Sequence, residues 1–301
     1  MNTRLSTNNA YLRLHLGILI ASGTGIFGRM ISLTELPLVW YRLLIAGLTL
    51  AGIMFLNHRL HRIPLRNLAK ICGCGTLLTI HWIFFYASIK ASNVSIAVVC
   101  IALDGFFTAI LDPIISRRRF SIREIMLSLI TLAGILLIFG FDARYRLGIL
   151  LGVSCSFTYA LFSIYSKRVQ QTTGHKSSTM LMYEIVGGWA LLSVIMPVYI
   201  TYINPQLNIV PTIADTVMLL VFGSIFTVGP FLMQLQALRS ISAFTVNLSY
   251  NLEPLYSIVL AMIIFNEGSE LSRYFWLGVM MTILSVVLQT IYSRRPHDIK
   301  P

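Results

Sequence analysis

The chain has 301 residues, of which 56% are hydrophobic and 11% are charged, and its mean hydropathy is +0.78. A soluble globular protein carries about 25% charged residues, so this composition excludes a soluble domain and indicates a chain that crosses a membrane several times. The formal net charge of +12 does not indicate nucleic-acid binding, because the basic residues fall between apolar stretches, where the positive-inside rule places them.

Ten apolar stretches follow one another along the chain, each of about 20 residues, which is the length that a bilayer core requires. We therefore predict an all-α polytopic membrane protein with ten transmembrane helices. The predicted spans are 14–33, 37–56, 68–89, 92–114, 122–141, 147–168, 179–201, 213–237, 242–265 and 272–293.

The basic residues predict the orientation of these spans. Seventeen of the 23 lysines and arginines fall on one predicted side and four on the other, while Arg29 and Arg42 lie inside spans. The positive-inside rule then predicts a multi-pass protein of the cell's inner membrane with both termini in the cytoplasm.

Arg29 and Arg42 lie near the outer ends of spans 1 and 2, roughly 6–8 Å below the membrane surface at about 1.5 Å per residue. One interpretation is that both side chains extend to the water. The other is that they face a cavity, where a planar guanidinium binds a carboxylate or phosphate of the substrate.

Two acids lie close to the middle of predicted spans. Asp104 is in span 4 and Glu253 is in span 9, and an ionisable residue at this depth is costly to bury and indicates function. Asp112 and Glu184 lie nearer the cytoplasmic ends. We expect Asp112 to pair with Arg117–Arg119, and Glu184 to be structural, near a lysine of the preceding loop.

The chain contains one helical unit twice. Sliding the sequence by about 149 residues places Asp104 on Glu253, and a turn at Phe141–Arg146 joins the halves. We predict repeats at 1–145 and 146–301. Each repeat has five spans, an odd number, so the two must have opposite orientations, as in many secondary transporters.

Spans 8 and 9 contain residues suited to bending and binding. Gly229 and Pro230 interrupt span 8, and Pro254 interrupts span 9, because proline removes a backbone hydrogen bond; we predict hinges there. Asn247 and Tyr250 lie on the same helical face as Pro254 and are candidate substrate-binding residues.

No cofactor or metal is expected from the sequence. Gly23, Gly25 and Gly28 have the spacing of a dinucleotide fingerprint, but inside an apolar span this spacing indicates close helix packing. Cys72 and Cys74 have no second cysteine pair or nearby histidines, as a zinc site would require.

Three segments resemble the EamA-type members of the drug/metabolite transporter superfamily. They are Trp40–Ala46, Tyr86–Ser92 and the stretch from Asn251-Leu-Glu253-Pro254 to Asn266-Glu267. The resemblance implies ten helices in two inverted repeats. It also supports Tyr86 as a candidate substrate-binding residue.

The sequence therefore predicts a secondary transporter that moves a small polar organic metabolite, such as an amino acid, outward by alternating access. Protons are the candidate coupling ion, and the oligomeric state is left open. The alternatives are a transporter of a larger solute such as a drug or nucleotide sugar, a passive channel, or an intramembrane lipid-modifying enzyme. We expect no catalytic residues.

Overall fold

The computed structural model describes residues 7–58, 63–101, 103–138 and 146–265, and short helical pieces between residues 277 and 291. Every regular element in this part of the chain is an α-helix, and no strand occurs there. The predicted all-helical fold class is thus confirmed. Almost all of the predicted turn at Phe141–Arg146, and all of residues 266–271 between the predicted ninth and tenth spans, lie outside the described residues.

Thirteen helices lie in the described chain between residues 7 and 265. They are α1 (Thr7–Ala21), α2 (Thr24–Met30), α3 (Glu35–Leu56), α4 (Leu65–Ala91), α5 (Val94–Ile101), α6 (Leu103–Ser116), α7 (Ile122–Ile138), α8 (Arg146–Thr173), α9 (Ser177–Tyr202), α10 (Ile213–Ser224), α11 (Val228–Ala237), α12 (Ala243–Tyr250) and α13 (Glu253–Phe265).

Seven stretches of the described chain are long and apolar enough to cross a membrane, and they match predicted spans 1–4 and 6–8. These stretches are Asn9–Met30, Glu35–Leu56, Leu65–Ala91, Ile96–Ser116, Arg146–Thr173, Ser177–Tyr202 and Ile213–Ala237. The fifth predicted span is α7, which has 17 residues. The ninth is divided into α12 and α13, and only pieces of the tenth are described.

Several helices continue past the predicted apolar limits. The third span was predicted at 68–89 and α4 covers Leu65–Ala91, while the sixth was predicted at 147–168 and α8 continues to Thr173. The extra turns are polar and lie beyond the apolar stretch. They remain helical because a helix that leaves the bilayer core keeps its backbone hydrogen bonds. Hydropathy alone therefore underestimates these helices.

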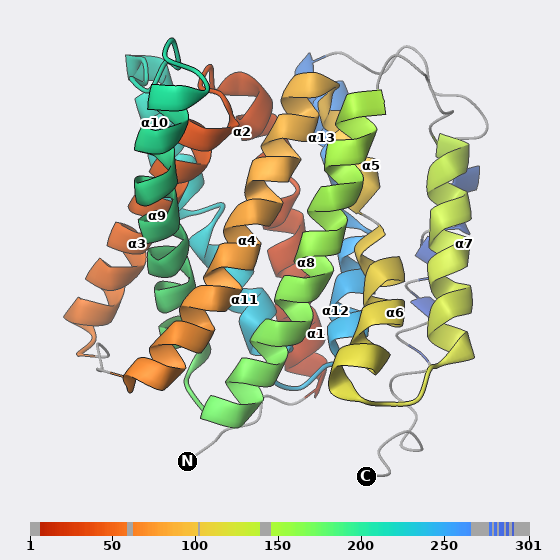
Figure 1. The fold of residues 1–301 in the computed structure, drawn as a ribbon. Coiled ribbons are helices and arrows are strands. Elements are labelled where there is room, and N and C mark those ends of the chain that lie inside the picture. Colours follow the sequence, from red (N-terminus) through yellow and green to blue (C-terminus); the bar gives the residue numbers. More distant parts are fainter. Residues whose placement is uncertain are drawn as a thin grey trace.

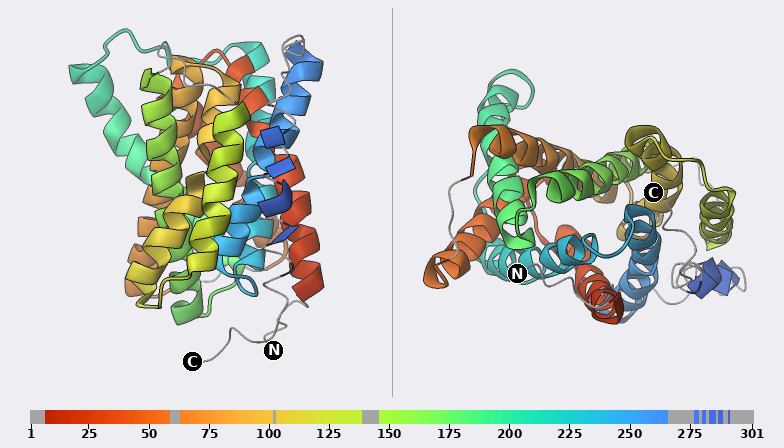
Figure 2. Two further views of the ribbon diagram at one scale, coloured as in Figure 1. Left: turned by 90° about the vertical axis from the view of Figure 1, so that its right-hand side faces the viewer. Right: turned by 90° about the horizontal axis from the view of Figure 1, so that it is seen from below.

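Figure 1 shows that successive spans run in opposite directions through one bundle, and Figure 2 shows the same bundle from the side and end-on. In both, α7 lies at the edge of the bundle. Its neighbour there belongs to the last predicted span, because Thr131 donates a hydrogen bond to Ser285 at 2.9 Å. The fifth and tenth spans thus pair at the periphery.

The helix pairing has the symmetry of an inverted repeat. α4, the third span, packs on α8, the sixth; correspondingly, α11 of the eighth span packs on α1 of the first. α4 also packs on α9, as α10 packs on α3, and α6 of the fourth span contacts α12 of the ninth. Exchanging the two halves reproduces each of these pairs.

Two spans of the second half are interrupted just before a proline. Residues 225–227 separate α10 from α11, and Pro230 is the third residue of α11. Residues 251–252 separate α12 from α13, and Pro254 is the second residue of α13. Each proline lacks the N–H that would bond to the carbonyl four residues earlier, which explains why the helical hydrogen bonding stops there.

Capping side chains set the starts of two of these helices. Thr212 and Asp215 form a reciprocal capping box at the start of α10, and the Ser242 hydroxyl accepts a hydrogen bond from the Thr245 backbone N–H at 3.0 Å at the start of α12. Such caps satisfy backbone donors that have no partner within the helix.

Candidate substrate-binding site

Arg42 lies at the centre of a cluster of buried polar and aromatic residues. It belongs to α3, the second span, and only 1% of its surface is exposed. Its Nε donates a hydrogen bond to Thr227 Oγ1 at 2.8 Å, and its Nη1 donates to the Tyr86 hydroxyl at 2.6 Å. Thr227 lies in the interruption between α10 and α11. Arg42 therefore connects the two halves of the chain.

Aromatic rings surround the Arg42 guanidinium. Its Cζ lies 4.0 Å from the ring centre of Trp82, 4.4 Å from that of Phe222 and 5.8 Å from that of Tyr86. Among the described residues, no carboxylate lies within ion-pairing distance of it. A buried cation held only by neutral groups and π faces can still bind an anion.

Glu253 interacts with Arg42 through its charge, without forming an ion pair with it. It is the first residue of α13 and is 7% exposed. The Thr24 hydroxyl hydrogen-bonds to its carboxyl group, and its charge interacts with that of Arg42. One turn further on, the Ser257 hydroxyl donates to the Ser22 carbonyl oxygen at 2.8 Å. The start of α13 is thus fixed against the interruption between α1 and α2.

Asp104, in α6, lies near Ser156 and Tyr159 of α8. It is fully buried, and neither of its carboxyl oxygens has a hydrogen-bond partner among the residues that the structure describes. The Ser156 hydroxyl donates instead to the Cys100 carbonyl oxygen at 2.5 Å. Since buried polar groups are nearly always paired, Asp104 is available for a proton, a cation or a substrate.

Asn247 and Tyr250 have different surroundings although they share a helix. The Asn247 amide donates to Thr108 at 2.8 Å and accepts from Ser163 at 3.0 Å, so it ties α12 to α6 and α8. Both its amide nitrogen and its amide oxygen therefore already have a partner within the protein. The Tyr250 ring lies 6.2 Å from the Tyr159 ring.

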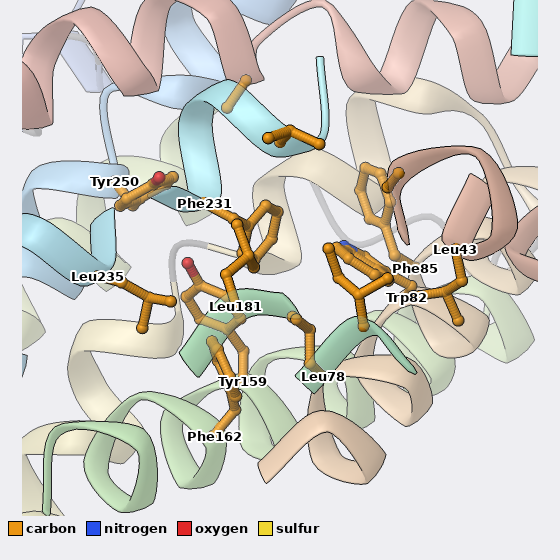
Figure 3. Packing of buried hydrophobic residues seen from close by; sticks show 14 of the residues in the cluster. Leu43, Leu78, Trp82, Phe85, Tyr159, Phe162, Leu181, Phe231, Leu235 and Tyr250 are labelled. Atoms are coloured by element: carbon orange, nitrogen blue, oxygen red, sulfur yellow. The ribbon is translucent and has the colours of Figure 1, made fainter. Parts of the chain in front are cut away.

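Figure 3 shows how the aromatic residues divide the centre of the bundle. Tyr159 and Tyr250 lie on one side of Phe231, and Trp82 and Phe85 lie on the other. The Phe231 and Trp82 rings meet edge to face at 4.9 Å. Phe231 belongs to α11, directly after Pro230, so movement of this helix would change the separation between the two sides.

The structure brings most, but not all, of the predicted site residues together. Arg42, Tyr86 and Glu253 form one electrostatically connected group, and Asp104 interacts with Glu253. Arg29 does not join them, because it lies at the end of α2 with an exposed side chain.

Sequence reasoning did not identify several residues of the site. Trp82 and Phe222 surround Arg42, and Thr227 accepts its hydrogen bond. Asn251, which is 1% exposed, has no hydrogen-bond partner for either amide atom within the described chain. Asn251, unlike the other three, begins the segment before Glu253-Pro254 that the sequence singles out, whereas the aromatic residues give no signal beyond hydrophobicity.

The two remaining acids have different outcomes. Asp112 accepts a hydrogen bond from Arg118 at 2.9 Å, as the pairing with Arg117–Arg119 predicted. Glu184 is fully buried and accepts from Ser166 at 2.7 Å. The lysine of the preceding loop, Lys176, is the residue just before α9, about two helical turns from Glu184. It is not a hydrogen-bond partner of Glu184 within the described chain.

No group of three or more His, Cys, Asp or Glu side chains converges as a metal site among the described residues. The nearest arrangement is a pair, in which His81 Nδ1 lies 3.1 Å from Cys155 Sγ. Two ligands do not complete a zinc site, which needs three or four protein ligands.

Comparisons with known proteins agree with this architecture. The EamA-like transporter family matches residues 9–140 and 146–291. A Bacillus subtilis (strain 168) protein named "uncharacterized transporter YxxF" is 22% identical over 94% of this chain and 90% of its own length. A crystal structure with 16% identity has the same fold, with a TM-score of 0.75 over 96% of this chain and 100% of the other. The chain belongs to the EamA-like transporter family and is a membrane transporter.

Proposed function

We propose that the protein is a secondary transporter that exports a small polar organic metabolite carrying a carboxylate, of the amino acid class, by alternating access. One observation carries the proposal: a fully buried arginine at the interface of the two halves has, among the described residues, only neutral hydrogen-bond partners. A guanidinium presents a planar fork of donors that matches a carboxylate.

The surroundings of Arg42 support recognition of a small zwitterion. Glu253 lies close enough for its charge to act on Arg42, so an opposite charge on the same ligand would have a partner there. Trp82 and Phe222 provide apolar and π surface beside the guanidinium. Ligand pockets combine a mostly apolar lining with a few polar groups in this way.

Alternating access needs segments that bend between the halves. Gly229 and Pro230 follow the interruption of the eighth span, and Pro254 follows that of the ninth. We assign the hinges to these positions, because helices without continuous backbone hydrogen bonds bend at lower cost. Thr227, which accepts a hydrogen bond from Arg42, lies in the α10–α11 interruption. Bending there would therefore change this hydrogen bond.

Asp104 and Glu253 are the candidate proton carriers. Both are buried acids at matched positions of the two repeats, and their charges interact. Two neighbouring carboxylates in a dry interior are not both ionised readily. Uptake of a proton at one of them would couple transport to a proton gradient.

Solute flux in proteoliposomes tests the proposal. The vesicles are loaded with one labelled solute at a time from a panel of the twenty standard amino acids, simple organic acids, amines and one nucleotide sugar. We expect saturable movement of amino acids that an imposed pH gradient accelerates. Saturable movement of the nucleotide sugar alone, or non-saturable leakage of every solute, would contradict it.

A further inference from the structure

Arg42 has a counterpart in the second half of the chain. In Trp40–Leu44 a tyrosine precedes the arginine and two aliphatic residues follow it; Met182–Val186 has the same pattern with Glu184 in place of the arginine. Arg42 lies in α3 and Glu184 in α9, the second span of each half. Both are buried, at 1% and 0% exposed.

The backbone contacts of these two residues also correspond. A Cβ added to Gly223 of α10 would lie 3.3 Å from the Arg42 carbonyl oxygen, and one added to Gly75 of α4 would lie 2.0 Å from the Glu184 carbonyl oxygen. Gly75 and Gly223 are 148 residues apart in the chain. The α3–α10 and α9–α4 interfaces are therefore equivalent, with an arginine at one and a glutamate at the other.

The side chains are bonded differently at the two interfaces. Thr79 and Thr227 are also 148 residues apart. Thr227 accepts a hydrogen bond from Arg42 across its interface, whereas Thr79 donates to a carbonyl oxygen of its own helix at 2.8 Å. Glu184 accepts from Ser166 with one oxygen, and its Oε2 has no partner among the described residues.

A glutamate with a purely structural role is expected to have both oxygens paired, because a buried unpaired oxygen is destabilising. Glu184 also lies away from Arg42 along the bundle. α3 and α9 run antiparallel, with Trp40 bonded to Ser193 and Gly47 against Ile185. At about 1.5 Å per residue, this places Glu184 about 10 Å further towards the end where α8 turns into α9.

We propose that Glu184 is a second substrate station, which binds the ammonium group of the substrate through its unpaired oxygen. The inference rests on the proposed function and deepens it. Arg42 binds the carboxylate when the substrate is near the α2–α3 end, and Glu184 binds the ammonium group when the substrate is near the α8–α9 end. The separation of about 10 Å along the axis means that a small amino acid occupies one station at a time.

The test compares three kinds of solute in proteoliposomes that contain the full chain. The first is an amino acid that the wild type transports. The second is the analogous carboxylate without the amino group, and the third is the analogous amine without the carboxyl group. Glu184→Gln keeps the hydrogen bond from Ser166 but removes the charge. We expect it to raise the half-saturating concentration at least tenfold for the amino acid and the amine, and by less than twofold for the carboxylate.

Two further variants separate binding from structure. Thr201→Ala changes an exposed residue at the far end of the helix that contains Glu184, outside both stations, so we expect all three solutes to behave as in wild type. Glu184→Asp keeps the charge and should preserve the preference for ammonium compounds, even if Glu184→Gln fails to fold.

The possible results distinguish the two proposals. If the wild type carries amino acids but Glu184→Gln changes all three solutes equally, or Glu184→Asp loses the preference for ammonium compounds, the second station is wrong and the proposed function stands. If the wild type carries no amino acid, the proposed function fails and the second station fails with it.

Discussion

At the scale of single residues, the unusual feature is a set of buried charged groups that form no ion pair within the described part of the chain. Arg42 is held by the Tyr86 and Thr227 hydroxyls, and both oxygens of Asp104 lack hydrogen-bond partners in the described chain. Burying charge without a partner is destabilising. Selection retains such groups where a ligand or proton supplies the missing partner, and polar residues inside transmembrane segments are functional for this reason.

The two matched acids allow a prediction about pH. We expect Glu253→Gln and Asp104→Asn each to weaken or abolish the acceleration of transport by a pH gradient, because an amide takes up no proton. Transport is measured in vesicles at several internal and external pH values. Asp112→Asn is the matched control, since Asp112 pairs with Arg118 beyond the centre of the bundle. Normal pH dependence in both variants would exclude these acids as proton carriers.

The charged members of the site and Tyr86 could be predicted from the sequence, but the other groups around Arg42 could not. A carboxyl or guanidinium inside an apolar span is conspicuous, so Arg42, Asp104 and Glu253 were identified. The contact of Trp82 and Phe222 with the guanidinium depends on how three helices pack, which hydropathy does not encode. Arg29 has the same depth in the sequence as Arg42, yet its place on α2 turns it outward.

At the scale of helices, glycines determine how closely the two halves approach. Gly75 lets α4 contact the backbone of α9 at Glu184, and Gly223 lets α10 contact α3 at Ile45 and Arg42. Small residues at such crossings allow close van der Waals packing, which is the main attraction between helices in a membrane. These glycines therefore fix the positions of both charged residues.

Gly75→Ala tests this contact. The added Cβ would lie 2.0 Å from the Glu184 carbonyl oxygen, so α4 and α9 would have to separate, at a cost of about 3 kcal/mol. We expect a lower melting temperature for the purified protein in detergent. Gly73→Ala is the matched control, two residues away on the same helix, because nothing lies within 4 Å of its added Cβ. Equal melting temperatures for the two variants would contradict the packing account.

At the scale of the whole molecule, equivalent contacts tie the halves together at both ends of the bundle. Asp215, the third residue of α10, accepts hydrogen bonds from the Ser32 backbone and hydroxyl at 2.8 and 2.6 Å. Asn67, the third residue of α4, contacts His175 at 3.3 Å. The first tie involves a carboxylate and has two bonds. Such charge-assisted bonds are the stronger kind, so the contact of Asp215 with Ser32 is the stronger of the two.

The overall fold could be predicted because ten apolar stretches and a repeat with an odd number of spans restrict the arrangement severely. The interruptions between α12 and α13 and between α10 and α11 were foreseen only as prolines. The α10–α11 interruption is tied to Arg42 by Thr227, which lies in it, and tertiary contacts of this kind leave no periodic pattern in a single sequence.

Arg42 is the residue that we propose binds the carboxylate of the substrate. The most direct test is the half-saturating concentration for amino acid transport by Arg42→Lys in proteoliposomes, with Arg66→Lys, at an exposed position near the start of α4, as the control. We predict an increase of at least tenfold for Arg42→Lys, because an ammonium group cannot reproduce the planar fork, and no change for Arg66→Lys. An unchanged half-saturating concentration in folded Arg42→Lys protein would contradict the account.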